Sequence, residues 1–142
     1  MGHWETFYHL VWATKGREPM IDSPGEDIVS RSFRRTCQEA DVIVRAIGIM
    51  PDHVHLVLSI PPRWSVSAVV RHLKVEATHA IRNAAHLPYA GSFSWQHEFG
   101  TFTFGEASLK TIVGYVENQR RHHASNELRH RYERISSLES PT

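Results

Sequence analysis

Two histidines separated by one apolar residue, His53-Val54-His55, are the side chains in this sequence with the clearest capacity for chemistry. They follow Pro51-Asp52, which predicts a turn, and they begin a segment that predicts a β-strand through Ile60. Side chains alternate between the faces of a strand, so both imidazoles point the same way, with Cα atoms roughly 6–7 Å apart. Two imidazoles at this spacing can bind one metal ion. The pair alone is a weak signal, because ordinary surface or packed histidines show the same spacing.

A second pair of candidate groups lies on the helix predicted from Ser108, as its N-cap, to about Ala124. Tyr115 and Gln119 are four residues apart and therefore share one helical face. The amide oxygen of Gln119 is a neutral, hard ligand that could complete a metal site with the two imidazoles and leave positions open. The tyrosine could then attack whatever the ion polarises. The alternative interpretation is a buried tyrosine beside a surface glutamine.

The elements that must position these groups follow the order strand, helix, strand, strand, helix, strand, helix. The expected strands are 6–14, 42–49 and 53–60, followed by one or two short strands within 95–104 broken near Gly100. The expected helices before the tyrosine helix are 23–40 and 65–85, with Ser65 as an N-cap. The first six elements predict an α+β fold of the ferredoxin-like split βαβ type, an antiparallel sheet with two helices on one face. Val54, Leu56 and Leu58 would face these helices. The histidine pair would face the other side, where the C-terminal tyrosine-bearing helix would cover the sheet.

These residues together resemble the single-tyrosine HUH transposases, which include transposases of small insertion sequences and the REP-associated tyrosine transposases. The resemblance is carried by His53-Val54-His55 after Pro51-Asp52, and by Tyr115 and Gln119 ahead of His122-His123. The segments 8–15 and 95–100 are also similar, and the resemblance extends over roughly residues 6–124. It implies a single HUH-type catalytic domain at 1–124, followed by a polar C-terminal tail at 125–142.

The resemblance implies a DNA transposase that cleaves and rejoins single-stranded DNA through a 5′-phosphotyrosine on Tyr115. It also implies a divalent metal ion, Mg²⁺ or Mn²⁺, held by His53, His55 and Gln119. A free tyrosine has a pKa of about 10, so Tyr115 would need help to act as a phenolate. The implied partners are hairpin-forming DNA at the ends of the element and a second copy of the chain. Short members of the family form homodimers with exchanged tyrosine helices.

Charge offers a weaker indication of DNA binding, because the net charge is only +1. Basic residues nevertheless gather on one side of the second helix and near the tyrosine helix, and such patches can follow a phosphate backbone. A solvated helical face is at least as good an interpretation for any single arginine. The DNA-contacting candidates are Arg71, Lys74, Arg82, Arg120, Arg121, His122 and His123.

Composition favours one ordinary globular domain in the cytoplasm. The sequence has 142 residues, 41% of them hydrophobic, and no apolar run approaches the roughly 20 residues that a membrane span needs. The N-terminal residues show no secretory pattern. A single cysteine, Cys37, excludes an internal disulfide and suits a reducing compartment, and we expect it in the core.

Two other functions fit the same residues. The first is an inactive or repurposed protein that binds DNA hairpins on the same fold, although the intact Tyr115 counts against it. The second is a ferredoxin-like metal-sensing or small-molecule-binding domain, in which the histidines bind a regulatory metal and Tyr115 is structural. A covalent protein–DNA adduct would separate these three functions.

Overall fold

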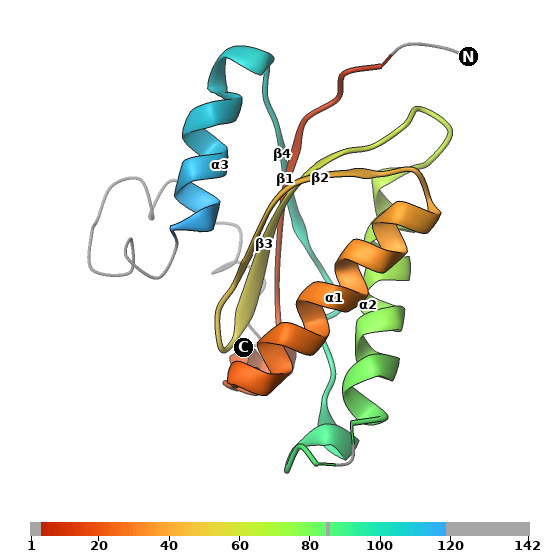
Figure 1. The fold of residues 1–142 in the computed structure, drawn as a ribbon, viewed down its shortest axis with the longest axis vertical. Coiled ribbons are helices and arrows are strands. Elements are labelled where there is room, and N and C mark those ends of the chain that lie inside the picture. Colours follow the sequence, from red (N-terminus) through yellow and green to blue (C-terminus); the bar gives the residue numbers. More distant parts are fainter. Residues whose placement is uncertain (1–3, 85, 119–142) are drawn as a thin grey trace.

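The computed structural model of this chain describes residues 4–84 and 86–118. Its strands and helices follow the predicted order, with short 3₁₀ turns between some of them (Figure 1). The elements are β1 (Tyr8–Ala13), η1 (Lys15–Arg17), α1 (Ser23–Glu39), β2 (Ile43–Ile49), β3 (His53–Ser59), α2 (Val66–Arg82), η2 (Ala90–Ser92), β4 (Gly100–Thr103), η3 (Glu106–Ser108) and α3 (Leu109–Glu117).

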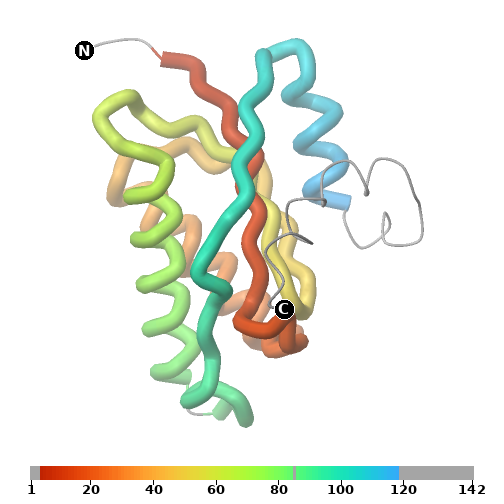
Figure 2. The backbone as a smooth tube through the Cα atoms, turned by 180° about the vertical axis from the view of Figure 1, so that it is seen from behind, coloured from red at the N-terminus to blue at the C-terminus, as the bar shows by residue number. Residues whose placement is uncertain are grey.

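The four strands form one antiparallel sheet in the order β2-β3-β1-β4. Helices α1 and α2 cover one face and α3 covers the other (Figure 1). From behind, the segment that leads from α2 into β4 runs along the sheet beside β1 (Figure 2). The predicted α+β fold, with a split βαβ sheet and a tyrosine-bearing helix on the opposite face, is therefore confirmed.

Each face of the sheet has its own apolar cluster. The larger one lies between the sheet and helices α1 and α2, and it includes Val54, Leu56 and Leu58 from β3, as the alternation predicted. Cys37 belongs to this core, and burial raises the pKa of its thiol to about 12, so the thiol is a packing group. The smaller cluster lies under α3 and consists of Ala46, Val57, Ile112, Tyr115 and Val116.

Both helices of the larger layer begin with a side-chain cap. The Oδ1 of Asp22 accepts a hydrogen bond from the Gly25 N–H at 2.9 Å, and the Ser65 Oγ accepts one from the Ala68 N–H at 3.0 Å. Each cap satisfies one of the backbone donors that a helix start leaves without an intrahelical partner. Ser65 was the predicted cap of α2, and the structure confirms it.

In the C-terminal part, the predicted capping bond of Ser108 is absent, and one of the one or two predicted short strands forms. Ser108 ends the turn η3 and makes no side-chain hydrogen bond to the start of α3, because its backbone is already helical (φ −94°, ψ −6°). The segment 95–99 contributes only an isolated bridge between Trp95 and Thr14, and β4 begins at Gly100. Helix α3 ends at Glu117, and Asn118 is its C-cap residue. Three predicted parts lie outside the described residues: the expected continuation of this helix to Ala124, the tail at 125–142, and Ala85.

The two caps should respond differently to pH. The pKa of Asp22 lies below its ordinary value of 3.8, because its carboxylate is hydrogen-bonded to the Tyr89 side chain and to the Gly25 N–H. A depressed folded-state pKa means that the cap stabilises the fold above the unfolded-state pKa and that this stability is lost as the pH falls through the folded-state pKa. We expect Asp22→Ala to lower the free energy of unfolding by about 1 kcal/mol at pH 7 and by less below pH 4.

Ser65→Ala is the matched control, because a serine hydroxyl does not titrate in this range. Its cost, also about 1 kcal/mol, should stay constant between pH 7 and pH 3. Urea unfolding of the three proteins across this pH range measures both effects. Equal pH dependence of the two variants would show that the Asp22 carboxylate does not act as a charged cap.

Candidate active site

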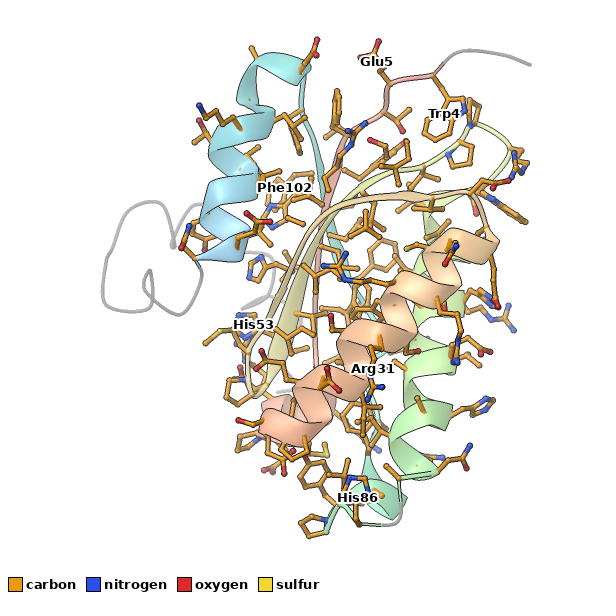
Figure 3. All side chains as sticks on the ribbon, in the orientation of Figure 1. Trp4, Glu5, Arg31, His53, His86 and Phe102 are labelled. Atoms are coloured by element: carbon orange, nitrogen blue, oxygen red, sulfur yellow. The ribbon has the colours of Figure 1, made fainter. Side chains whose placement is uncertain are left out.

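Strand β3 places both histidines on the face of the sheet that α3 covers. His53 and His55 are 3% and 0% exposed, and their ring centroids lie 5.2 Å apart in an edge-to-face arrangement. The labelled His53 lies near the turn that joins β2 to β3 (Figure 3). The structure therefore brings the pair together on one buried surface. Buried imidazoles need hydrogen-bond partners, because an unsatisfied polar group away from water is costly.

His53 finds its partner in the preceding residue. Its Nδ1 lies 2.7 Å from the Oδ1 of Asp52, and the Nη2 of Arg17 lies 3.4 Å from the Oδ2 of the same carboxylate. Burial alone would raise the pKa of Asp52, but the hydrogen bond and charge of His53, together with Arg17, outweigh it and hold this pKa below its ordinary value. Asp52 is therefore a carboxylate at neutral pH and fixes the orientation of the His53 ring.

The backbone around this carboxylate is also held in place. The main-chain oxygen of Asp52 accepts hydrogen bonds from the N–H of Thr14 at 2.9 Å and from its hydroxyl at 3.2 Å. Gly16 and Arg17 both have left-handed backbone angles, with φ of 66° and 52°. This conformation costs a non-glycine residue roughly 1–2 kcal/mol, and here it accompanies an Arg17 side chain directed at Asp52 and His53.

The second imidazole is held by a histidine that the sequence analysis did not select. The Nε2 of His9, on β1, lies 2.8 Å from the Nδ1 of His55, and the two rings stack with centroids 5.0 Å apart. His9 is 0% exposed. It stands opposite Val57 in the β1–β3 register, whereas His55 stands opposite Val11, so the two histidines are diagonal neighbours on one face. The alternation of side chains along β1 places His9 on one face of the sheet. Only the pairing of β1 with β3 shows that this face is the one that carries His55.

Helix α3 places Tyr115 over this pair. The Tyr115 side chain is 1% exposed, and its ring meets His55 and His9 edge to face, at centroid distances of 5.9 Å and 6.5 Å. Ile112 and Val116 of the same helix pack on Ala46 and Val57 of the sheet. These contacts position the helix, and with it the Tyr115 ring, over the sheet. The helix runs with its C-terminal end towards the β2–β3 turn (Figure 1). A single chain thus carries a tyrosine beside its own histidines.

The remaining groups predicted near the tyrosine lie outside the described residues. These are Gln119, Arg120, Arg121, His122 and His123. Within residues 4–84 and 86–118, no three His, Cys, Asp or Glu side chains are grouped so that they could hold a metal ion. The described part of the site is therefore a two-imidazole arrangement.

The hydrogen bonds of this arrangement match the chemistry of a metal site. Both histidines engage Nδ1 with a neighbour, Asp52 for His53 and His9 for His55. Metal-binding histidines commonly use one ring nitrogen in this way, which fixes the ring while the other nitrogen binds the ion. The residues present therefore fit a divalent ion bound through the two Nε2 atoms.

The basic residues predicted on α2 lie on the opposite face of the sheet. Lys74 donates hydrogen bonds to the main-chain oxygens of Gln96, His97 and Glu98, at 2.8, 3.2 and 3.0 Å. Arg82 donates two to the main-chain oxygen of Phe93, at 3.1 and 2.8 Å. Arg71 is exposed, and all three residues line a hollow of about 470 Å³ between α2 and the segment before β4. Lys74 and Arg82 thus hold that segment in place, and DNA contact by these three residues stays a prediction.

This fold, with a buried histidine pair under a tyrosine-bearing helix, is the arrangement expected of a single-tyrosine transposase. A family model described as "Transposase IS200 like" matches residues 3–119, and the chain belongs to this family. Every helix in the described part of the chain is too short or too polar to cross a membrane.

Individual relatives agree with the family. The chain is 26% identical over 119 residues to the transposase for insertion sequence element IS200 of Salmonella typhimurium, covering 82% of this chain and 78% of that one. It is 28% identical over 117 residues to the ISDra2 transposase TnpA of Deinococcus radiodurans, covering 79% and 82%. Each similarity extends over most of both chains and is not confined to a short motif.

Two solved structures have a similar fold. One is a candidate transposase from Deinococcus radiodurans R1, with a TM-score of 0.65, 28% identity, and coverage of 84% of this chain and 95% of that one. The other is a REP-associated tyrosine transposase bound to a REP hairpin, with a TM-score of 0.65, 15% identity, and coverage of 87% and 75%. Because the sequence identity to the second structure is only 15%, this similarity shows a shared fold and nothing more.

Gly114, next to the tyrosine, offers a test of how α3 is packed. A Cβ built at Gly114 meets no atom of the described residues within 4 Å, so close packing in this arrangement does not require the glycine. Glycine within a helix costs about 1 kcal/mol relative to alanine. We therefore expect Gly114→Ala to raise the free energy of unfolding by up to about that amount, as measured by urea unfolding.

Gly25→Ala is the contrasting control. Its Cβ would lie 2.9 Å from the Tyr89 hydroxyl and 3.1 Å from the Asp22 carboxylate, so this variant should be less stable than wild type. A loss of stability in Gly114→Ala would show that this face of α3 is covered, for example by a second copy of the chain.

Proposed function

We propose that this protein cleaves and rejoins single-stranded DNA, with Tyr115 as the nucleophile and His53 and His55 as ligands of a divalent ion. The observation that carries the proposal is the position of the buried Tyr115 ring against His55, 5.9 Å between centroids, on the face opposite α1 and α2. Membership of the IS200-like transposase family supports DNA as the substrate. The hairpin bound to the REP-associated tyrosine transposase supports hairpin-forming ends as the DNA it binds.

In the proposed reaction the Tyr115 oxygen attacks a phosphodiester. A phosphorus–oxygen bond to Tyr115 forms as the bond to the 3′ oxygen breaks, which leaves a 5′-phosphotyrosine and a free 3′-OH. Because one phosphoester replaces another, the 3′-OH can reverse the reaction without a nucleotide cofactor. The burial of Tyr115, and the packing of Ile112 and Val116 beside it, would hold the nucleophile in one position over the sheet.

The chain's polar groups prepare the cation site. His53 would bind through Nε2 while Asp52 and Arg17 orient its ring, and His55 would bind through Nε2 beside it. Gln119, four residues after Tyr115 in the sequence, is the proposed third ligand. When bound, Mg²⁺ or Mn²⁺ would polarise the scissile phosphate and stabilise charge on the leaving 3′ oxygen.

We expect Tyr115→Phe to remove cleavage while the fold and hairpin binding are kept, because the ring makes the packing contacts and only the phenolic oxygen can attack. The substrates are single-stranded oligonucleotides that cover the DNA on both sides of the gene. A label at the 3′ end should become attached to wild-type protein, whereas a label at the 5′ end should appear in a free product. Both products should require Mn²⁺ or Mg²⁺ and disappear with a chelator.

Each alternative function gives a different result in this assay. A repurposed hairpin-binding protein shifts the oligonucleotide without forming an adduct, and a metal-sensing domain does neither. Wild-type rates of adduct formation in Tyr115→Phe would assign the nucleophile to another residue.

We also propose that the active form is a homodimer with exchanged α3 helices. Only Phe104 and Gly105 connect β4 to η3, and a Cβ at Gly105 would meet no described atom within 4 Å, so this connection is the place where an exchange would begin. The same apolar residues of α3 would then cover the partner's sheet. A single chain offers the same contacts to itself, so the two arrangements must be separated by experiment.

Mixing two inactive chains separates them. In an exchanged dimer, a Tyr115→Phe chain and a His53→Ala chain together rebuild one complete site. Activity should recover to roughly a quarter of wild type, because half of the dimers are mixed and each mixed dimer has one complete site. No recovery after subunit exchange has been verified, or a monomer by light scattering, would assign the active site to a single chain.

A further inference from the structure

His9 and His55 form a contact between two strands that are remote in sequence. The Nε2 of His9 lies 2.8 Å from the Nδ1 of His55, and the rings stack with an interplanar angle of 27°. Both side chains are fully buried, and Phe102 and Tyr115 lie against the His9 ring at centroid distances of 5.8 Å and 6.5 Å. The labelled Phe102 lies between the sheet and α3 (Figure 3). The contact is therefore shielded from water.

Apolar side chains flank His9 on its face of the sheet. Val11 and Val57 occupy neighbouring positions on the same face of β1 and β3, and both are fully buried. An imidazole in such a place loses its hydration, and this cost must be offset by the hydrogen bonds it makes. Packing alone would be served at least as well by leucine or phenylalanine. The bond to His55 is thus a feature that a histidine provides here and an apolar side chain could not.

Metal binding at His55 would decide which of the two rings donates this hydrogen bond. A neutral imidazole has one N–H donor and one acceptor nitrogen, and only the acceptor has a lone pair for a metal ion. If Nε2 of His55 is to bind a cation, Nδ1 must carry the hydrogen and donate it. The Nε2 of His9 is then the acceptor, and the hydrogen of His9 lies on its own Nδ1.

We propose that His9 is a positioning residue. It holds the His55 ring in place and favours the His55 tautomer whose Nε2 can bind a divalent cation. It does for His55 what Asp52 does for His53, with a neutral ring nitrogen in place of a carboxylate oxygen. This inference rests on the proposed metal-dependent function. It adds β1 to the elements that prepare the site, which thereby draws on β1, β3 and α3.

Calorimetric titration of the full chain with Mn²⁺ tests the proposal without measuring activity. His9→Leu fills a similar volume and removes the acceptor, whereas His9→Gln keeps an acceptor near the position of the imidazole Nε2. We expect His9→Leu to weaken Mn²⁺ binding roughly 10- to 100-fold and His9→Gln to restore most of it. Phe102→Leu is the matched packing control, since it changes the other side of the His9 ring, and it should bind as wild type does. His55→Ala shows how far Mn²⁺ binding falls when a proposed metal ligand is removed.

The tautomer is measured separately, by ¹⁵N NMR of the histidine rings in the metal-free protein. His55 should carry its hydrogen on Nδ1 in wild type and in His9→Gln, and lose this fixed state in His9→Leu. Thermal unfolding of each variant shows whether it is folded, and the wild-type NMR measurement decides the matter even if His9→Leu does not fold.

The outcomes distinguish the two levels of inference. Wild-type protein that does not bind Mn²⁺ would remove the proposed metal-dependent function and this inference with it. If wild type binds Mn²⁺ and folded His9→Leu binds it equally well, only the role of His9 is overturned. A wild-type His55 with its hydrogen on Nε2 would likewise overturn that role and leave the metal-dependent function standing.

Discussion

Strand β3 must be buried on both faces, and this constraint organises the rest of the molecule. It lies between β2 and β1 in the sheet, and all seven of its residues are buried. One set of side chains, Val54, Leu56 and Leu58, joins the core under α1 and α2. The other set lies under α3 and contains the two histidines and Val57. A shift of one residue would exchange the two sets, so the apolar set fixes the register that aims the histidines.

Burying two imidazoles on such a strand requires polar partners at fixed positions. Asp52 comes from the turn before β3, and His9 comes from the neighbouring strand. The turn itself is anchored by Thr14, which follows β1. The framework is thus built on β1 as much as on β3, because β1 contributes His9 directly and anchors Asp52 through its end. Buried hydrogen bonds of this kind favour one arrangement of the side chains, because breaking one would leave a polar group without its partner away from water.

Local patterns in the sequence predicted the parts of the fold that depend on neighbours in the chain. The alternation of β3 gave the faces of Val54 and His55 correctly, and Ser65 was recognisable as a cap because capping needs only the following turn. His9 was missed because its role depends on the β1–β3 register, which no local pattern contains. Lys74 and Arg82 resembled a DNA-facing stripe, although they donate to carbonyls of a segment that packs on α2 through long-range contacts. Each omission therefore concerns a contact between distant segments.

The tyrosine-bearing helix α3 is attached to this framework by a much smaller core. Beneath α3 the buried apolar side chains from the helix besides Tyr115 are Ile112 and Val116, whereas α1 and α2 share an extended cluster with the sheet. Burial of such side chains contributes roughly 1.5–3 kcal/mol each, so the docking of α3 is stabilised by a few kcal/mol. The histidines keep their Asp52 and His9 partners whatever the position of α3, because those partners belong to the sheet and its turns. The fold thus separates an imidazole pair whose partners belong to the sheet and its turns from a tyrosine carried by a helix with a smaller core. This division would suit the proposed reaction, in which Tyr115 is first joined to DNA and later released from it.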